Sequence, residues 1–342
     1  MQHEPRYSRR LTRSKALAAR RRRRRILIVA GSLFAALIGV AVTFALVLST
    51  TYQQNVTVLP DVFRDDDRRP AEATGEAAKA QTILLIGSDT RGELGSNNID
   101  DVQGSLADVI MVARVSSDRE SIHIMSIPRD SWVQQPNGSM GKINWSFSSG
   151  GAAGLVQTVE TMLDLRIDHV AAIDFESFKG LTDALGGVTV NNTVEWQRRG
   201  EYFGIGPVEL DGERALIFVR ERQLTGGDLA RVKQQQEYIR AVLAKTLTAE
   251  TLTDPGTLLA LVQQVSPFLA VDAGLSPGYL AGLAVEMPNI RADDVRFFTM
   301  PVGRGTFVGD QAVLPLNPDD IAELSKAFRD DSLESYEPPP AA

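Results

Sequence analysis

The sequence predicts an α/β domain of three layers (α-β-α) with a mixed central sheet, preceded by one N-terminal transmembrane helix. Short apolar runs alternate with helical patterns over 81–330, which is typical of a sheet covered by helices on both faces. Only Ser116–Glu120 separate two strand-like runs, and so short a turn joins antiparallel strands and makes the sheet mixed. An uncharged apolar segment at 26–48 indicates the transmembrane helix.

The first 48 residues have the pattern of a membrane anchor. Residues 1–25 hold 11 of the 36 lysines and arginines and one of the 43 acidic residues, whereas 26–48 hold no charge. The 23 residues of this apolar segment can span a bilayer core of about 30 Å, whereas the apolar region of a signal peptide has about 7–15 residues. Because basic flanks stay inside, we expect a single-pass cell-membrane protein with a cytoplasmic N-terminus (1–25) and an extracytoplasmic remainder.

Composition divides the extracytoplasmic part into three segments. Residues 49–80 are polar and charged, which predicts a linker that lifts the domain off the membrane. The domain itself is predicted over 81–330, and the proline-rich end, 331–342, is predicted to be a disordered tail. The chain has no cysteine, which excludes disulfides, thiolate metal sites and a cysteine nucleophile.

The elements of the domain follow from periodicity and from turn residues. The helix at 152–165, for example, places Leu155, Val159 and Met162 on one face, and the glycine pair Gly186–Gly187 ends the next helix. Strands are predicted at 82–87, 109–115, 121–127, 169–174, 188–191 and 295–300. Helices are predicted at 152–165, 176–185, 228–247, 257–265, 277–285 and 319–328.

A basic segment from Phe218 to Gln235 is the main candidate for a ligand site. If its first part is extended, Arg220 and Arg222 lie on one face and Glu221 lies on the other. A Thr-Gly-Gly turn then leads to Asp228, a favourable residue at the start of a helix. Arg231 and Gln235 fall on the same face of that helix as Asp228. Three arginines and a glutamine at a helix start suit a phosphate group; the alternative is a solvated, charged turn.

Other charged residues flank the predicted strands, where ligands of such sheets usually lie. They are Asp89 and Arg91 after the first strand, Asp108 before the second, and Arg129 with Asp130 after the third. Mg²⁺ prefers one or two carboxylates together with phosphate oxygens, which fits Asp89 and Asp108 beside a pyrophosphate. The alternatives are a turn or helix cap for Asp89, a strand-edge position for Asp108 and a surface ion pair of Arg129 with Asp130. His123 and His169 lie in apolar runs and are expected to pack in the core.

Eight motifs in one order resemble the LytR-CpsA-Psr family. With the helix that follows them, they cover about Thr82 to Leu247, and together they are highly specific although each is weak alone. The motifs are Leu84–Arg91, Ala107–Val112, Ser126–Asp130, Lys142–Asn144, Leu185–Val190, Leu210–Leu216, Arg220-x-Arg222 and Gly227–Gln235.

The resemblance implies a membrane-anchored phosphotransferase, which moves an anionic glycopolymer from a polyprenyl-pyrophosphate carrier to peptidoglycan through a phosphodiester. Some members of the family hydrolyse pyrophosphate lipids, and an older name for the family is transcriptional regulator or attenuator. The matched positions imply Asp89 and Asp108 as the acids near Mg²⁺, although another divalent cation is compatible with them. The implied pyrophosphate-binding set is Arg129, Arg220, Arg222, Arg231 and Gln235, with Lys142 as a further motif residue.

The chain departs from the family pattern at two positions, Leu106 and Gln234, where relatives often carry arginine. Both departures remove positive charge, so substrate affinity or donor type is expected to differ.

The expected mechanism follows from the charges. Mg²⁺ and the arginines stabilise the charge that develops in transfer, and one carboxylate, Asp89 or Asp108, takes the proton of the acceptor hydroxyl. The alternatives are an envelope protein that binds or hydrolyses polyprenyl pyrophosphate, and a membrane-bound regulator. Against a regulator, the cytoplasmic segment is too short for a DNA-binding fold and the remainder has a net charge of −17, so we expect membrane lipid but no nucleic acid as a partner.

Overall fold

The computed structural model describes residues 38–63, 69–88, 107–221, 224, 227–248, 250–251 and 254–339. The chain divides into two compact units, 1–50 and 51–342. Of the predicted membrane segment, only 38–48 are described, and these residues are helical. Among the residues that the structure describes, no helix combines the length and the apolar character that crossing a bilayer requires.

The second unit is built on a sheet of seven strands in the order β1-β12-β7-β2-β3-β4-β13. Strands β2, β3 and β4 pair antiparallel, whereas β7 pairs parallel with β2, and β13 pairs parallel with β4. The sheet is therefore mixed, as predicted. The strands are β1 Thr57–Leu59, β2 Gln81–Ser88, β3 Ala107–Val115, β4 Ile122–Ser126, β7 His169–Asp174, β12 Leu269–Asp272 and β13 Val295–Thr299.

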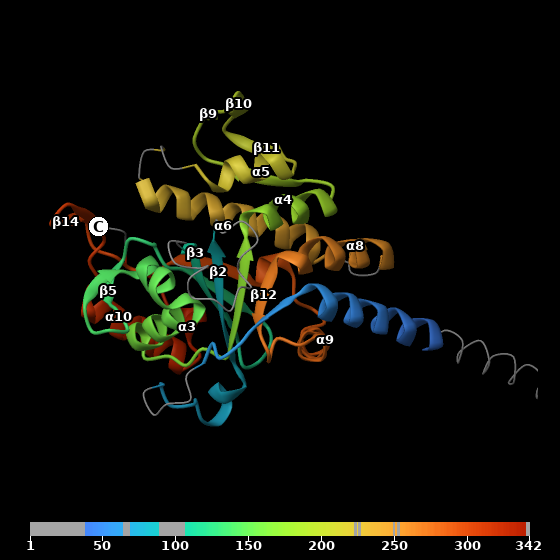
Figure 1. Ribbon diagram of the computed structural model, residues 1–342, viewed down its shortest axis with the longest axis horizontal. Helices are drawn as coiled ribbons and strands as arrows, with labels where there is room; N and C mark the ends of the chain where they lie inside the picture. Colours follow the sequence, from blue (N-terminus) through green and yellow to red (C-terminus); the bar gives the residue numbers. More distant parts are fainter. Residues whose placement is uncertain are drawn as a thin grey trace, which may run out of the picture. The chain divides into compact units, whose positions relative to one another are not determined.

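Helices pack on both faces of this sheet (Figure 1). In β3, Ile110 and Val112 join a buried cluster that includes residues of α3 and α10, whereas Val109, Met111 and Ala113 join a second cluster that includes residues of α4, α5, α6 and α8. Successive side chains of a strand point to opposite faces, so β3 separates the two cores. These helices are α3 Ile143–Leu163, α4 Phe175–Ala184, α5 Gly212–Val219, α6 Gly227–Thr246, α8 Pro255–Val265 and α10 Pro318–Arg329, and α9 is Pro277–Glu286.

Most predicted elements are present within a few residues, and the exceptions have local causes. Helix α3 begins nine residues before the predicted start at 152, but Gly151 adopts φ 59° and ψ −153° and kinks it there. Only glycine adopts such a conformation without strain, so a second helical segment precedes the predicted one. Three short hairpins were not predicted, because strands of three residues carry too little periodicity. They pair β5 Trp132–Gln134 with β6 Met140–Lys142, β9 Trp196–Arg198 with β10 Glu201–Phe203, and β14 Thr306–Val308 with β15 Gln311–Val313. The strand predicted at 188–191 is β8 Val188–Asn192, which pairs with β11 Gly206–Leu210.

The segment predicted as a linker is docked on the domain over much of its described length. Strand β1 pairs with β12 at one edge of the large sheet, and Val62 is buried in the first core cluster. Arg69 donates hydrogen bonds to both carboxylate oxygens of the buried Glu160, at 2.7–3.2 Å. Residues 57–62 and 69 therefore belong to the folded unit, because they satisfy a sheet edge and a buried carboxylate.

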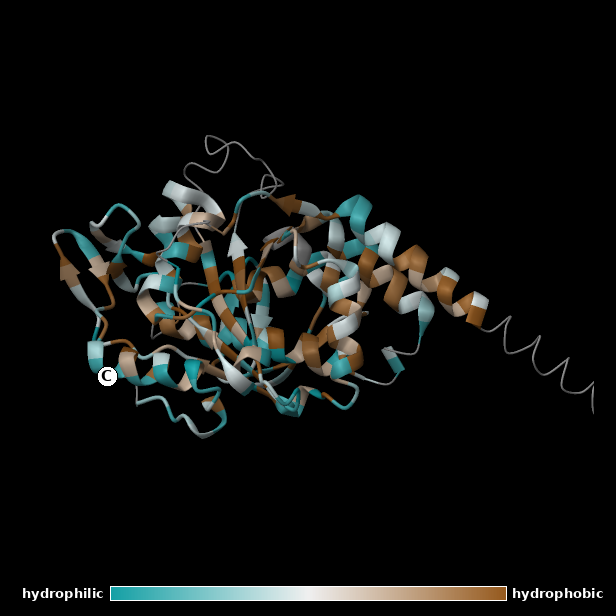
Figure 2. Ribbon diagram, turned by 90° about the horizontal axis from the view of Figure 1, so that it is seen from below, coloured by the Kyte–Doolittle hydropathy of each residue, from teal (hydrophilic) through white to brown (hydrophobic). Residues whose placement is uncertain are grey.

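The predicted disordered tail also differs from expectation over residues 331–339. Leu333 and Tyr336 are buried in the first core cluster, and Tyr336 packs against Phe298. Arg114, which is buried, forms an ion pair with Asp331 at 3.3 Å. The composition of the tail is that of a disordered segment, but two apolar side chains and one ion pair hold it on the sheet. Figure 2 shows hydrophobic residues concentrated along the central strands.

Candidate functional site

The candidate site begins at the ends of three inner strands, where β2 and β4 end and β3 starts; these strand ends form the sheet edge at the site. The pairing of Met111 with Ser126 continues through a hydrogen bond from the Ile127 amide to the Ile110 carbonyl at 2.8 Å. This register places Asp108, the second residue of β3, beside the segment that follows β4. Arg129 Nη1 consequently lies 2.5 Å from Asp108 Oδ1. The two residues, 21 positions apart in the chain, form an ion pair that the sequence motifs alone did not connect.

The hairpin of β5 and β6 adds a second ion pair. Lys142, the last residue of β6, lies with its Nζ 2.9 Å from Asp130 Oδ1. Asp130 also lies 4.0 Å from Arg129 through its Oδ2 and the arginine Nε. The backbone of the segment is held in place because the Asp130 carbonyl accepts from the amide of Leu314, whose carbonyl accepts from Trp132. Arg129, Asp130 and Lys142 are therefore presented by a fixed turn and hairpin.

The first turn of α6 brings a third acid and a third cation. Asp228 contacts Arg231 one helical turn later, and its Oδ1 lies 3.7 Å from Arg129 Nε. The side chain of Arg231 is only 4% exposed. Gln235 is buried, and its amide nitrogen lies 3.5 Å from the Val219 carbonyl. The predicted common face of this helix is thus confirmed for Asp228 and Arg231, and Asp228 links both to Arg129 at the sheet edge.

Arg220 lies at the C-terminal end of α5, as its C-cap in a helical conformation. The prediction of an extended segment is therefore wrong at Phe218–Arg220, because the apolar run before the arginine is helical and packs on the second core. The predicted site residues Asp89, Arg91 and Arg222 lie outside the described residues, as does Leu106.

Six of the described charges of the site form one connected network, in which positive and negative charges balance. Arg129, Lys142 and Arg231 contribute three positive charges, and three carboxylates contact them, with side chains between 4% and 22% exposed. The carboxylates are Asp108, Asp130 and Asp228. Charges this far from water are tolerated because they are paired, and removing one partner of such a pair typically costs about 3–5 kcal/mol. An anion that binds here must therefore displace a carboxylate from one of the cations, or it must bind together with an additional cation.

A sequence model of the LytR_cpsA_psr family matches residues 47–330. The chain belongs to this family. Among curated relatives, it is 30% identical over 308 residues to "Cell wall biosynthesis protein LcpA" of Corynebacterium glutamicum, covering 78% of this chain and 58% of that protein. It is 34% identical over 205 residues to "Polyisoprenyl-teichoic acid--peptidoglycan teichoic acid transferase TagU" of Bacillus mycoides, covering 59% of this chain and 64% of that protein. The chain thus spans about 60% of the length of these relatives.

Solved structures share the fold of this LytR_cpsA_psr member. The structure of B. subtilis TagV superposes with a TM-score of 0.64 at 22% identity, covering 76% of this chain and 99% of that one. A structure described as "TagT bound to LI-WTA" superposes with a TM-score of 0.60 at 22% identity, covering 80% and 98%. The predicted α/β fold, a mixed sheet with flanking helices, is therefore confirmed.

The structure also explains the departure from the family pattern at Gln234. Its side chain is buried and does not enter the ion network. With its amide oriented to satisfy both atoms, Gln234 donates to the Phe218 carbonyl and accepts from the Trp196 indole, both at 3.3 Å. Gln234 therefore links strand β9 to α5 and α6, a contact that the sequence pattern did not indicate.

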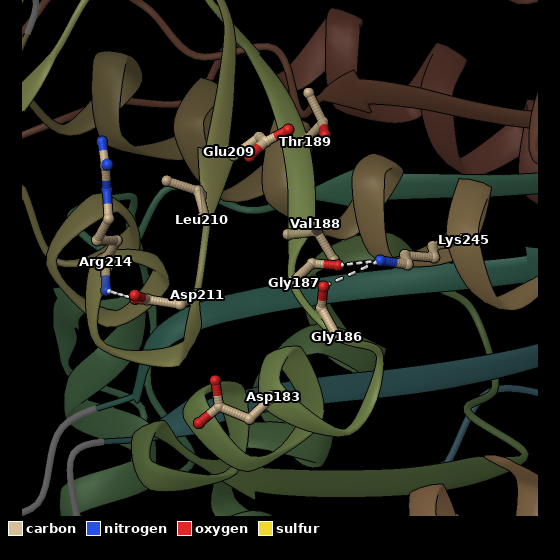
Figure 3. Close-up of a pocket in the computed structure, with 10 residues that line it drawn as sticks. All are labelled: Asp183, Gly186, Gly187, Val188, Thr189, Glu209, Leu210, Asp211, Arg214 and Lys245. Atoms are coloured by element: carbon tan, nitrogen blue, oxygen red, sulfur yellow. Dashed lines mark hydrogen bonds between the residues drawn. The ribbon is translucent and has the colours of Figure 1, made fainter.

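A polar cavity of about 450 Å³ lies at the opposite end of α6 (Figure 3). Lys245 enters it and donates to the carbonyls of Gly187, at 2.6 Å, and Gly186, at 3.3 Å. Asp228 and Lys245 are 17 residues apart in this helix, which corresponds to about 25 Å. The cavity is therefore separate from the ion network. Its lining residues are Asp183, Gly186, Gly187, Val188, Thr189, Glu209, Leu210, Asp211, Arg214 and Lys245.

Proposed function

We propose that this protein is a phosphotransferase that attaches an anionic glycopolymer, delivered on a polyprenyl-pyrophosphate carrier, to peptidoglycan through a phosphodiester. The observation that carries the proposal is the convergence of Arg129, Lys142 and Arg231 from three separate segments at one sheet edge. The name of the relative TagU, a teichoic acid transferase, points to the same class of substrate, and that of LcpA points to cell wall biosynthesis.

The arginines of the site are the proposed pyrophosphate ligands. Guanidinium groups bind phosphate oxygens through two parallel hydrogen bonds, and Arg129 and Arg231 both contact the one carboxylate of Asp228. An anion can therefore be held where this carboxylate now lies between two cations. Arg220 at the end of α5, with Arg91, Arg222 and Gln235, completes the proposed set, and Lys142 neutralises Asp130 beside it.

The donor atoms of this edge fit Mg²⁺, and the proposed ligands are Asp89 and Asp108. Asp108 offers one described carboxylate, which also contacts Arg129, and no group of three acidic or histidine ligands occurs among the described residues. Mg²⁺ needs only one or two carboxylates when phosphate oxygens and water complete its shell. When bound, it adds the positive charge that the balanced network lacks and neutralises the pyrophosphate.

The proposed reaction is a displacement at the phosphorus that carries the glycopolymer. The acceptor hydroxyl oxygen of peptidoglycan forms a bond to this phosphorus, and the bridging P–O bond of the pyrophosphate breaks. Polyprenyl phosphate leaves with the bridging oxygen, and the hydroxyl proton passes to a carboxylate, Asp89 or Asp108. Arg129 holds Asp108 in a fixed position for either role through their 2.5 Å contact. The proposed membrane anchor at 26–48 keeps the domain near its lipid-linked substrate.

The test is a transfer assay with the full-length protein in detergent. The protein is incubated with a glycopolymer on polyprenyl pyrophosphate and with peptidoglycan oligomers, with Mg²⁺ or with EDTA. We expect a phosphodiester-linked product by mass spectrometry only when Mg²⁺ is present. Release of polyprenyl phosphate without a linked product would indicate hydrolysis in place of transfer, and neither product would refute both activities.

Substitutions of Asp89 and Asp108 in the same assay test whether these acids bind the metal ion or accept the proton. We expect Asp89→Ala and Asp108→Ala to lose transfer and the dependence on Mg²⁺ while binding of the pyrophosphate lipid is kept or strengthened, because each change removes a negative charge that repels the pyrophosphate. The matched control is Asp118→Ala, in an exposed turn outside the site, which should behave as the unsubstituted protein. Near-normal, Mg²⁺-dependent transfer by both alanine variants would show that the base and the metal ligands lie elsewhere.

A further inference from the structure

Helix α9 is apolar, yet it contributes no buried residue to either core. Its ten residues, Pro277–Glu286, include one charged side chain, Glu286, which accepts from Arg119 Nε at 2.8 Å. None of the ten is buried, and Leu280 and Val285 are 37% and 79% exposed. An apolar helix of a folded domain normally turns its apolar side toward a core, so the exposed side of α9 calls for a partner outside the domain.

The inner side of α9 is held on the domain, which gives its outer side a fixed direction. Tyr279 packs on His169 of β7, with ring centroids 4.2 Å apart, and its hydroxyl donates to Gln81 Oε1 at 3.0 Å. Leu283, one helical turn later, is half-buried. The outer face of α9 is about 140° wide, from the helical spacing of about 3.6 residues per turn. It is formed by Leu280, Ala281, Ala284 and Val285, all of them exposed.

The chain itself brings the proposed membrane anchor close to the start of α9. The Tyr52 hydroxyl donates at 3.0 Å to the carbonyl of Leu275, two residues before the helix. Tyr52 follows the predicted membrane segment, 26–48, by four residues. Because a residue advances the chain by at most about 3.6 Å, Tyr52 lies within about 14 Å of the end of that segment. Tyrosine is also typical of the membrane–water interface, so the start of α9 is expected at the membrane surface.

We propose that the outer face of α9 lies on the lipid bilayer that holds the chain's own anchor. Ten residues make a helix about 15 Å long, half of a bilayer core of about 30 Å, so α9 can lie along the surface but cannot cross it. Apolar helix faces in this position are buried about 5–10 Å into the boundary between headgroups and acyl chains. The inference goes beyond the proposed function, and it rests on the proposed anchor at 26–48.

A second contact with the bilayer fixes the orientation of the domain. The anchor alone attaches the domain by one end of its chain, about which the domain can tilt. With α9 docked as well, the domain is attached at two points, and the sheet edge at the site keeps one orientation toward the membrane.

The proposal is tested with single cysteines, which are specific labelling sites because the sequence has no cysteine of its own. Full-length Val285→Cys carries an environment-sensitive fluorophore and is reconstituted into vesicles of phosphatidylcholine and phosphatidylglycerol, with or without a lipid that bears a quencher near its headgroup. We expect emission at shorter wavelength than in the control, and loss of emission when the quencher is present.

The matched control is Ile205→Cys with the same label. Ile205 is 71% exposed and lies between β10 and β11, which Figure 1 shows apart from α9; its emission should not respond to the quencher. Leu280→Glu, added to the labelled Val285→Cys protein, should reduce the quenching, because a charge on the outer face disfavours its burial in lipid. Unchanged quenching in that variant would show that the label inserts by itself, and the inference would be overturned.

Two further outcomes would overturn the inference. One is a response at Val285→Cys no larger than that at Ile205→Cys. The other is a response that depends on protein concentration and not on the quencher lipid, because a second copy of this chain would then cover α9. A label on Val40→Cys, within the predicted anchor, should be quenched by a lipid with its quencher deep in the acyl chain. If it is not, the anchor fails and the inference fails with it, whereas the transfer assay decides the proposed activity separately.

Discussion

The two ends of helix α6 differ in how they use charge. At the first end, Asp228 and Arg231 join a network of buried and partly buried side chains that come from β3, the turn after β4 and the hairpin of β5 and β6. At the last end, Lys245 donates to the backbone carbonyls of Gly186 and Gly187 beside an open polar cavity. In the cavity, the cation of Lys245 thus bonds backbone carbonyls, whereas the cations at the first end pair with carboxylates.

This difference indicates that a binding site for a polyanion is identified by cations that converge from separate segments. Cations that are buried or partly buried are costly to bring together from separate segments, since each must be paired with an acid, so their convergence needs a function to explain it. A lysine that bonds the carbonyls near a helix C-terminus is an ordinary stabilising contact. Four predictions test this comparison, ordered from the largest expected effect to the smallest.

The largest effect is expected from removing Arg129. Arg129→Ala leaves Asp108 and Asp228 without a common cation in a buried setting, so unfolding should become easier by about 3–5 kcal/mol, and transfer should be lost. Lys245→Ala at the other end should cost about 1 kcal/mol and leave transfer unchanged. Chemical denaturation and the transfer assay measure both quantities. Equal losses in the two variants would remove the distinction between the ends.

The next effect concerns affinity at the first end. Arg220→Ala and Arg222→Ala should each weaken binding of a pyrophosphate lipid by about 1.5–3 kcal/mol, which is more than tenfold. Arg199→Ala, a change of the same kind outside the motifs, serves as the control. If calorimetry gives the same affinity for all three variants, the basic segment is a solvated turn.

A smaller effect of opposite sign is expected from Asp228. Asp228→Asn removes one negative charge between Arg129 and Arg231, so the network becomes net positive, and a pyrophosphate lipid should bind more tightly by about 1 kcal/mol, roughly fivefold. Asp183→Asn is the matched change in the cavity, where Asp183 accepts from the Gly212 amide at 2.8 Å. Its affinity should stay unchanged, and a gain there would show that the cavity also senses the ligand.

The smallest effect is expected at His123, a residue outside both ends of α6, and concerns how the stability of the protein depends on pH. Burial lowers the pKa of His123 from its usual 6.5, while Glu334 opposes the shift. The unfolded chain therefore binds more protons near this range, so stability should rise with pH and fall on acidification from about pH 7 to about pH 5. In His123→Gln this part of the pH dependence should disappear. Melting temperatures measured across this range should show the difference, and an unchanged slope would exclude His123 as its source.

The sequence by itself determined the main elements, the mixed sheet and the family. Periodic apolar runs predicted the central strands and most helices, because side-chain alternation and helical spacing are local properties of the chain. The motif order predicted Asp108, Arg129, Lys142 and Arg231 as site residues, and the structure brings these four to one sheet edge. Whether they bind substrate stays a prediction.

Only the tertiary structure decided which charges meet. Strand register places Asp108 against Arg129, and helix packing places Asp228 between two arginines; neither follows from spacing along the chain. It also decided that Gln234 faces Trp196, that Arg198 pairs with Glu221, and that the segments around Val62 and Tyr336 are buried. The physical reason is common to all of these cases: a polar or charged segment looks solvated in sequence until folding supplies the partner that makes its burial favourable.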